Sequence, residues 1–163
     1  MVRLECSERS WLIPSDKFSD LVMQNWFLAN TTHVVDLLFY LLGTVEVFSV
    51  NNRVGNKVDE KIITGLGNCL GDVPFVYSGA WCAPGGWVVQ IYFDGSRADL
   101  MPLERLTITK INGENEITEE GENPAIKPGF MEMIDDFLQG REMLLPTFRE
   151  VQEKLAIYRK MSG

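Results

Sequence analysis

The sequence contains little of what most metal, disulfide and nucleic-acid sites require. Among its 163 residues there are one histidine and three cysteines (Cys6, Cys69 and Cys82), and no two cysteines have the Cys-x-x-Cys spacing. A zinc site and a disulfide framework are therefore both unsupported, and we expect no metal ligands. Acidic residues outnumber basic ones by 23 to 15, and this net charge of −8 argues against a nucleic-acid partner.

Long apolar runs and a secretion signal are also missing. No stretch approaches the ~20 apolar residues of a membrane span, and the first six residues lack the charged-then-apolar order of a signal peptide. Apolar residues make up 45% of the chain and charged residues 23%, which is ordinary globular usage. We therefore expect one cytoplasmic domain over residues 1–163, with no membrane partner.

A glycine-rich segment comes close to a dinucleotide-binding loop but does not match it. The segment Gly65-Leu66-Gly67-Asn68-Cys69-Leu70-Gly71 has its third glycine one residue too late for G-x-G-x-x-G. Its neighbours have strand periodicity on both sides, whereas the motif requires a strand before it and a helix after it. We interpret the glycines as part of a strand and expect no cofactor-binding residues in this chain.

Hydrophobic periodicity predicts an α+β fold. Alternation over residues 2–10 indicates a strand, residues 11–29 read as an aromatic-rich loop, and residues 30–43 form an apolar helix. Asn30, Thr31 and Thr32 are candidate N-caps, and Gly43 ends the helix. Because this helix is apolar nearly all round, we expect it to be buried.

The remaining sequence predicts antiparallel hairpins followed by two helices. Turn residues separate six strand-like runs, and Asp94-Gly95 is the strongest hairpin signal. Residues 113–127 read as an acidic loop, and helices follow over 128–140 and from the capping box of Thr147 and Glu150 to Met161. We predict a mostly antiparallel open sheet with helices packed on one face. The six runs are residues 45–50, 61–70, 73–82, 87–93, 96–100 and 106–111.

The one histidine lies in the first turn of the apolar helix. His33 precedes Asp36 by three residues, which puts both side chains on one helix face, where the carboxylate could orient the imidazole. A carboxylate in an apolar helix needs a partner, for which backbone amides, His33 or an arginine are the candidates. Asp36 is therefore predicted to be structural, while His33 alone fits either a structural or a functional role.

The His33 helix carries a resemblance to a known family. The string Asn-Thr-Thr-His-Val-Val-Asp-Leu-Leu-Phe-Tyr-Leu-Leu-Gly over residues 30–43 resembles the start of the C-terminal domain of the glucose-fructose oxidoreductase, inositol dehydrogenase and MocA family (Gfo/Idh/MocA). The strands that follow, the turn at Asp94-Gly95 and the segments Pro128-Gly129-Phe130 and 136–140 are similar as well. In such enzymes a Rossmann domain comes first, and we expect that half, with its Glu-Lys-Pro lysine, to be absent here.

The resemblance implies an oxidoreductase that transfers hydride between NAD or NADP and a sugar-like substrate. His33 matches the histidine of the family motif Asp-x-x-x-His and is the catalytic candidate, whereas Ala29 stands at the aspartate position. Asn30, Trp26 and Lys127 are the substrate-binding candidates. The resemblance also implies a homo-oligomer formed through the open sheet face, and no turnover by this chain alone because hydride transfer needs both reactants in contact.

Two alternatives remain open at this point. The chain could be a free-standing, non-catalytic module that dimerises or binds a small ligand, an interpretation that Ala29 favours. It could also be complemented by a separate Rossmann chain. Trp26, Trp81 and Trp87 could line a site, although burial in a core is the commoner use of tryptophan.

Overall fold

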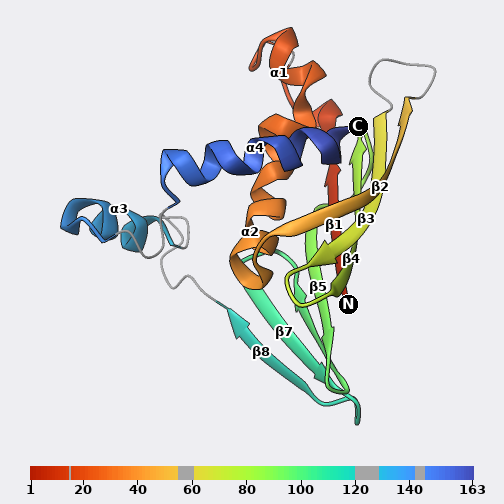
Figure 1. Cartoon of the computed structure of the whole chain (residues 1–163), viewed down its shortest axis with the longest axis vertical. Coiled ribbons are helices and arrows are strands. Elements are labelled where there is room, and N and C mark those ends of the chain that lie inside the picture. The colour runs from red at the N-terminus through yellow and green to blue at the C-terminus, as the bar shows by residue number, and fades with distance from the viewer. Residues whose placement is uncertain (15, 55–60, 120–128, 142–145) are drawn as a thin grey trace.

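A computed structural model describes residues 1–14, 16–54, 61–119, 129–141 and 146–163 (Figure 1). The described residues form an eight-stranded open sheet with the order β2-β3-β4-β1-β5-β6-β7-β8. Its strands are β1 Val2–Glu8, β2 Val45–Val54, β3 Lys61–Cys69, β4 Val73–Trp81, β5 Trp87–Phe93, β6 Ser96–Leu100, β7 Arg105–Lys110 and β8 Asn115–Glu119. The helical segments are η1 Ser10–Leu12, α1 Asp20–Gln24, η2 Phe27–Thr31, α2 Thr32–Leu42, α3 Phe130–Gln139 and α4 Phe148–Ser162. The predicted α+β fold is confirmed.

The sheet is antiparallel except at its centre. β1 pairs parallel to β4 and antiparallel to β5, so the N-terminal strand lies between two hairpin systems. All other neighbouring strands pair antiparallel. At the β5–β6 hairpin both turn residues have positive φ, 38° at Asp94 and 70° at Gly95, as the predicted turn requires.

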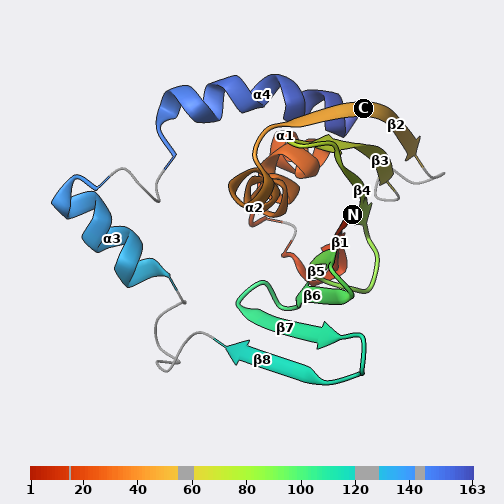
Figure 2. The same cartoon turned by 60° about the horizontal axis from the view of Figure 1, so that its bottom comes forward.

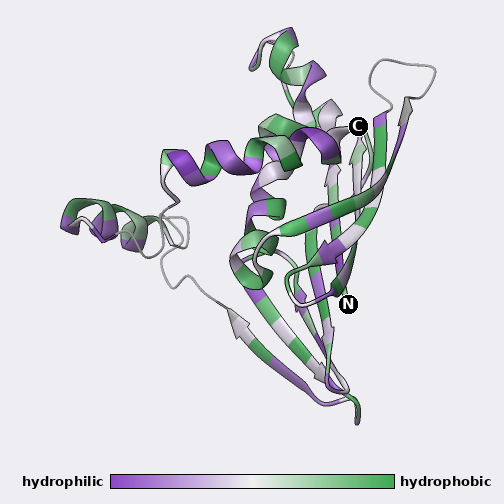
Figure 3. Cartoon of the chain, viewed as in Figure 1, coloured by the Kyte–Doolittle hydropathy of each residue, from purple (hydrophilic) through white to green (hydrophobic). Residues whose placement is uncertain are grey.

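The core lies between one face of strands β1–β5 and the helices η2, α2 and α4. Alternate strand residues such as Leu4, Ile63 and Phe75 are buried, and they meet Phe27 and Leu38 from the helices. Figure 2 shows α2 inside the curve of the sheet, with α4 running across the same side. The hydropathy colouring of Figure 3 shows the matching alternation along the strands.

Three predictions for the N-terminal helix region were wrong. Residues 11–29 contain the short helix α1 and parts of η1 and η2, where a loop was expected. No side-chain cap precedes α2, because the π-turn η2 runs directly into it and already provides the preceding helical carbonyls. The helix is also only partly buried, since Tyr40 is 66% exposed.

Two further differences concern the second half of the chain. Residues 115–119 of the expected acidic loop form strand β8, which pairs with β7 across the turn at Asn112 and Gly113. The acidic side chains concealed this strand, whose apolar content is a single isoleucine. The helix expected from Pro128 begins at Phe130 after Gly129 at φ 80°, and Pro128 lies outside the described residues.

The described structure has neither a membrane-spanning helix nor a cluster of metal-binding side chains. No helix in these ranges is long and apolar enough to cross a lipid bilayer. Nor do the described side chains include three or more His, Cys, Asp or Glu grouped so that they could hold a metal ion.

Candidate functional site

A glutamate at the end of the central strand organises the candidate site. Glu8 follows Val2, Leu4 and Cys6 on the helix-facing side of β1, and its Oε1 accepts two hydrogen bonds. Asn30 donates one through Nδ2 at 2.6 Å, and Trp87 donates the other through Nε1 at 2.8 Å. These two donors compensate the partly buried carboxylate and tie η2 and β5 to β1.

His33 joins this cluster through its contact with the same tryptophan. The imidazole stacks on the Trp87 ring with 6.0 Å between centroids and an interplanar angle of 30°. His33 is exposed while Trp87 is half-buried, so the imidazole lies at the surface against a fixed indole. Glu8 holds Trp87, and Trp87 supports His33, which defines a Glu8–Trp87–His33 row with Asn30 at its side.

Two cavities flank Glu8. The larger, about 620 Å³, lies between the end of β1, the turn before Trp87 and the turn that leads to β7. The smaller, about 290 Å³, lies between the ends of β1 and β4 and the segments η1, α1 and η2. Glu8 lines both, Trp87 lines the larger and Asn30 the smaller. A volume of 300–1,000 Å³ is typical of small-molecule sites.

The predicted site residues are only partly brought together. Asn30 and Trp26 line the smaller cavity, and so does Ala29 at the position of the family's aspartate. Trp26 is 3% exposed and stacks on Trp81 with 5.4 Å between centroids, so it belongs equally to the core. Lys127 lies outside the described residues.

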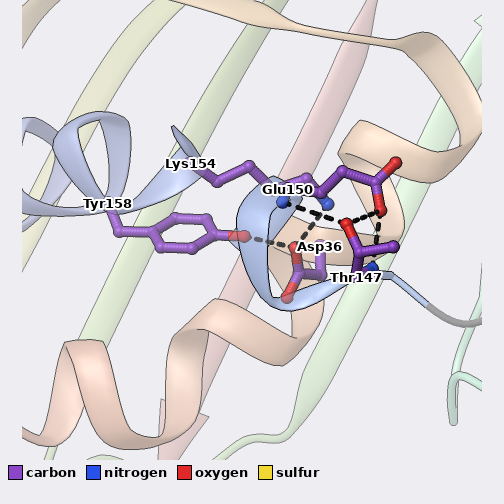
Figure 4. A network of polar contacts seen from close by, with 5 residues as sticks. All are labelled: Asp36, Thr147, Glu150, Lys154 and Tyr158. Carbon is purple, nitrogen blue, oxygen red and sulfur yellow. Dashed lines mark hydrogen bonds and ion pairs between the residues drawn. The ribbon is translucent and has the colours of Figure 1, made fainter. Parts of the chain in front are cut away.

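Asp36 makes contacts other than the predicted ones. Its Oδ1 accepts a hydrogen bond from the Tyr158 hydroxyl and pairs with Lys154 Nζ at 3.1 Å, both from α4 (Figure 4). Backbone amides, His33 and arginine are therefore not its partners. Burial and the neighbouring carboxylate raise the pKa of Tyr158, which keeps its hydroxyl protonated as a donor. Asp36 thus fastens α2 to α4 at a distance from the Glu8 cluster.

The capping box predicted for α4 is present. Thr147 Oγ1 accepts a hydrogen bond from the Glu150 amide at 3.3 Å, and the Glu150 carboxylate accepts one from the Thr147 amide at 2.6 Å (Figure 4). The bond from the Thr147 amide, together with one that the Thr147 hydroxyl donates to the same carboxylate at 2.8 Å, lowers the pKa of Glu150. The box fixes where α4 begins and so where Lys154 and Tyr158 meet Asp36.

The cysteine beneath the site is not a reactive group. Thr31 Oγ1 donates a hydrogen bond to Cys6 Sγ at 3.3 Å, and burial raises the pKa of this thiol to about 12. A buried thiol with a raised pKa is a poor nucleophile at neutral pH. Cys6 therefore packs the junction of β1 with η2.

Sequence reasoning missed Glu8, although a signal for it existed. Val2, Leu4 and Cys6 alternate to one face of the predicted strand, and the next position on that face is Glu8. A carboxylate on the core side of a strand needs donors, which marks it as a candidate site residue. Its two donors come from residues 22 and 79 positions away, so the sequence alone could not identify them.

The glycine-rich segment serves the sheet. Gly65 and Gly67 lie on β3, where a Cβ at Gly65 would fall 2.3 Å from the Tyr77 ring. A Cβ at Gly67 would fall 2.0 Å from the Glu46 carbonyl oxygen. Only glycine fits such close approaches, so the segment has no room to cradle a phosphate.

Comparisons with known proteins give matches at the level of structure. No family model and no curated protein sequence matches the chain. A dehydrogenase (MviM) from Clostridium difficile is 14% identical, with a TM-score of 0.69 over 98% of this chain and 52% of that one. The UDP-N-acetylglucosamine 3-dehydrogenase GnnA from Acidithiobacillus ferrooxidans is 17% identical, with a TM-score of 0.65 over 98% and 51%. The apo form of a levoglucosan dehydrogenase is 13% identical, with a TM-score of 0.69 over 98% and 55%.

The chain thus spans about half the length of the solved structures that it matches. It has the fold of the C-terminal part of Gfo/Idh/MocA oxidoreductases, which confirms the resemblance found in residues 30–43 at the level of the fold. The Glu8 cluster lies where the first strand, β1, meets the first long helix, α2.

Proposed function

We propose that this chain is the substrate-binding and dimerisation domain of an NAD- or NADP-dependent oxidoreductase, located in the cytoplasm, that acts on a sugar or sugar derivative. The observation that carries the proposal is the Glu8–Trp87–His33 row beside a cavity of about 620 Å³. Structures with this fold include a levoglucosan dehydrogenase in complex with NADH. Three free cysteines suit a reducing compartment.

In this proposal each residue of the cluster has a distinct part. His33 forms a hydrogen bond with a substrate hydroxyl on the solvent side of Trp87 and transfers a proton to or from it. Trp87 offers an apolar ring for a sugar face and keeps the imidazole in place. Glu8 holds the Trp87 indole and the Asn30 amide, and its second carboxylate oxygen is available to a substrate hydroxyl.

The described residues do not fit a dinucleotide. The glycine-rich segment 65–71 packs within the sheet and leaves no room for a phosphate. A nicotinamide supplies hydride chemistry when bound, and in our proposal other residues of the parent enzyme hold it. The described chain orients the sugar, and we expect no turnover from it alone.

For dimerisation we propose the open face of the sheet. Ile62, Leu66 and Val76 point away from the core on neighbouring strands and are each at least 40% exposed. Apolar side chains gathered on one sheet face are typical of a subunit contact. Sedimentation of the chain should therefore give twice the monomer mass, and Leu66→Glu should shift it toward the monomer.

A titration followed by NMR tests the substrate part. Levoglucosan, D-glucose and N-acetyl-D-glucosamine are added separately to labelled protein, and we expect saturable shifts of the Trp87 indole N–H with at least one of them. His33→Ala and Glu8→Gln should weaken that sugar's binding about threefold to tenfold, the range for one lost hydrogen bond. Tyr40→Phe is the matched control on α2. Shifts that never saturate, or that avoid Trp87, contradict the proposal.

Ala29 favours a second candidate, a non-catalytic ligand-binding module. Alanine cannot take a proton, so a chain that retains the cavity without the family's aspartate could bind a sugar without acting on it. An NADH fluorescence titration of the chain alone tests whether the cofactor binds to other residues of the parent enzyme and not to this chain. Saturable micromolar binding of NADH would show that this assignment is wrong.

A further inference from the structure

Two helices present apolar side chains that no described part of the chain covers. Those of α3 and of the first half of α4 recur at spacings of three or four residues, so each set shares one side of its helix. Figures 1 and 2 show both segments projecting from the sheet to the same side. A folded chain rarely leaves apolar groups gathered in this way unless something binds there. This bare helix face consists of six side chains that are each at least 40% exposed: Phe130, Ile134, Phe137 and Leu138 on α3, and Phe148 and Val151 on α4.

The charges of α3 lie away from the bare helix face. By helical spacing Glu132, Asp135 and Asp136 fall on the other side of the helix. Arg141 donates a hydrogen bond to Asp136 at 2.7 Å and also pairs with Asp135, so two of these carboxylates already have a cation. A partner that binds the bare helix face must therefore offer apolar side chains, because the face provides no charge to attract a nucleic acid or a charged small molecule.

The exposed half of α4 leads toward the candidate site. Its apolar stripe passes from Val151 to Tyr158, which is 4% exposed and donates a hydrogen bond to Asp36 on α2 (Figure 4). Lys154 lies one turn after Val151 and pairs with the same carboxylate at 3.1 Å. Asp36 in turn follows His33 by one turn of α2. A body seated on the exposed half of α4 therefore lies next to the α2 turn that carries His33.

This position favours the cofactor-holding part of the parent enzyme as the occupant. Hydride transfer requires the nicotinamide and the substrate in contact, so that part must approach His33. A domain of about 100 residues has a radius of gyration of about 13 Å, which is enough to extend from α4 to a substrate at His33. This chain covers 54% of a levoglucosan dehydrogenase solved in complex with NADH, so that enzyme has a further part of nearly equal length.

A second copy of this chain fits the bare helix face less well. The dimer contact proposed above uses Leu66 and its neighbours on the open face of the sheet. In contrast, α3 and α4 lie on the side of the sheet that carries the helices (Figure 2). The proposed dimer therefore leaves the bare helix face uncovered and free for a different partner.

We propose that the bare helix face binds the cofactor-holding part of the parent enzyme through apolar contacts and keeps it against His33. The inference rests on the proposed function and deepens it by naming the surface that joins the sugar-binding and cofactor-holding parts. Phe137 and Leu138 are then docking residues that touch neither substrate nor cofactor. Their loss should separate the two parts while each still binds its own ligand.

The test compares residues 1–163 alone with the parent enzyme, isolated through an affinity tag at the C-terminal end of this chain. Hydrogen exchange is followed in residues 129–141, which include α3, and in residues 147–155, which include the first half of α4. Both segments should exchange at least about tenfold more slowly in the parent enzyme, because covered helices open less often. The turn at Gly71 and Asp72 is the reference and should exchange alike in both.

Two leucines of nearly equal exposure give matched variants. Leu138 on α3 is 73% exposed, and Leu70 in the turn between β3 and β4 is 75% exposed. In the parent enzyme, Leu138→Asp should return the exchange of residues 147–155 to the level of the isolated chain. It should also lower turnover of the sugar that binds at Trp87 at least about tenfold, since a displacement of about 1 Å can cost about 100-fold. NADH binding, followed by fluorescence, should stay unchanged, and Leu70→Asp should alter none of these measurements.

The outcomes separate this inference from the proposed function. Equal exchange of the two segments in the isolated chain and in the parent enzyme would overturn the inference, and so would equal effects of Leu138→Asp and Leu70→Asp. Slow exchange in the isolated chain that is lost on dilution would identify a second copy as the occupant and would also overturn it. Slowed exchange in the parent enzyme without sugar binding at Trp87 would contradict only the proposed function. An isolated protein that contains nothing beyond this chain would contradict both.

Discussion

The inner body and the outer region of this chain differ in how they are held. The inner body comprises β1–β5, Trp26 with η2, α2 and the C-terminal half of α4, and every buried apolar side chain of the core comes from it. The outer region comprises β6–β8 and α3. The side chains of β6 and β7 are half-buried or exposed, and Asp136 is the one buried described residue in α3.

α3 shows the difference most clearly. Both views place it apart from the sheet, and its apolar residues are green in Figure 3 although they face solvent. Phe137 is 75% exposed and Leu138 is 73% exposed. Apolar helix residues are therefore largely buried in α2 and exposed in α3. A hydrophobic stripe identifies a helix face that can be covered, and the rest of the fold decides whether it is.

Truncating one apolar side chain in each region should give the largest difference in the free energy of unfolding. Leu38 on α2 is fully buried, so Leu38→Ala should lower the free energy of unfolding by about 3 kcal/mol. Phe137→Ala on α3 should change it by less than about 0.5 kcal/mol, as expected at an exposed position. Urea unfolding measures both changes. A comparable loss for Phe137→Ala would show that α3 is covered in solution and would remove the distinction.

A smaller effect tests the attachment of α4 to the inner body. Tyr158→Phe removes the hydroxyl that donates to Asp36, and Lys154 remains as the carboxylate's partner. We expect a loss of about 1.5 kcal/mol in the free energy of unfolding, the upper range for one hydrogen bond. Tyr40→Phe is the matched control, since Tyr40 lies on α2 and is 66% exposed. Equal effects of the two variants would mean that the Asp36 contact contributes nothing.

The sequence predicted those parts of the fold that depend on local signals. Strands β5 and β6 have the predicted bounds because Asp94 and Gly95 specify a two-residue turn. The insertion of β1 between β4 and β5 could not be predicted, since strand pairing over such separations leaves no local signal. The cap prediction failed for a related reason. Asn30 and Thr31 direct their side chains to Glu8 and Cys6, which are distant in sequence, and so neither caps the helix.

The candidate site divides in the same way. His33 and Asn30 were found because they lie in one short string of residues, and Ala29 was recognised there as a departure from the family motif. Glu8 depends on contacts that the fold creates between the end of β1, the helix η2 and strand β5. Candidate residues that share one short string can therefore be proposed from sequence, whereas those that complete a cavity from other elements require the structure.

The smallest effect concerns pH and again separates the two regions. Burial raises the pKa of Cys6 from 9.0 to about 12, and it also raises the pKa values of Tyr77 and Tyr158. All three groups belong to the inner body. Between pH 9 and 12 the unfolded chain releases the Cys6 proton while the folded chain keeps it, so the unfolded state binds fewer protons and stability falls as pH rises. The full contribution is present below pH 9.

We therefore expect the free energy of unfolding to fall by about 1 kcal/mol between pH 9 and pH 10, since one group contributes at most about 1.4 kcal/mol per pH unit. Urea unfolding followed by tryptophan fluorescence measures this in the inner body, where Trp26 and Trp81 are buried. Cys6→Ala should have a lower free energy of unfolding at pH 8 and a flatter dependence above pH 9. If its pH dependence matches that of the wild type, other groups cause the alkaline loss. The inner body would then owe its sensitivity first to Cys69, whose pKa burial also raises, and not to the thiol beneath the site.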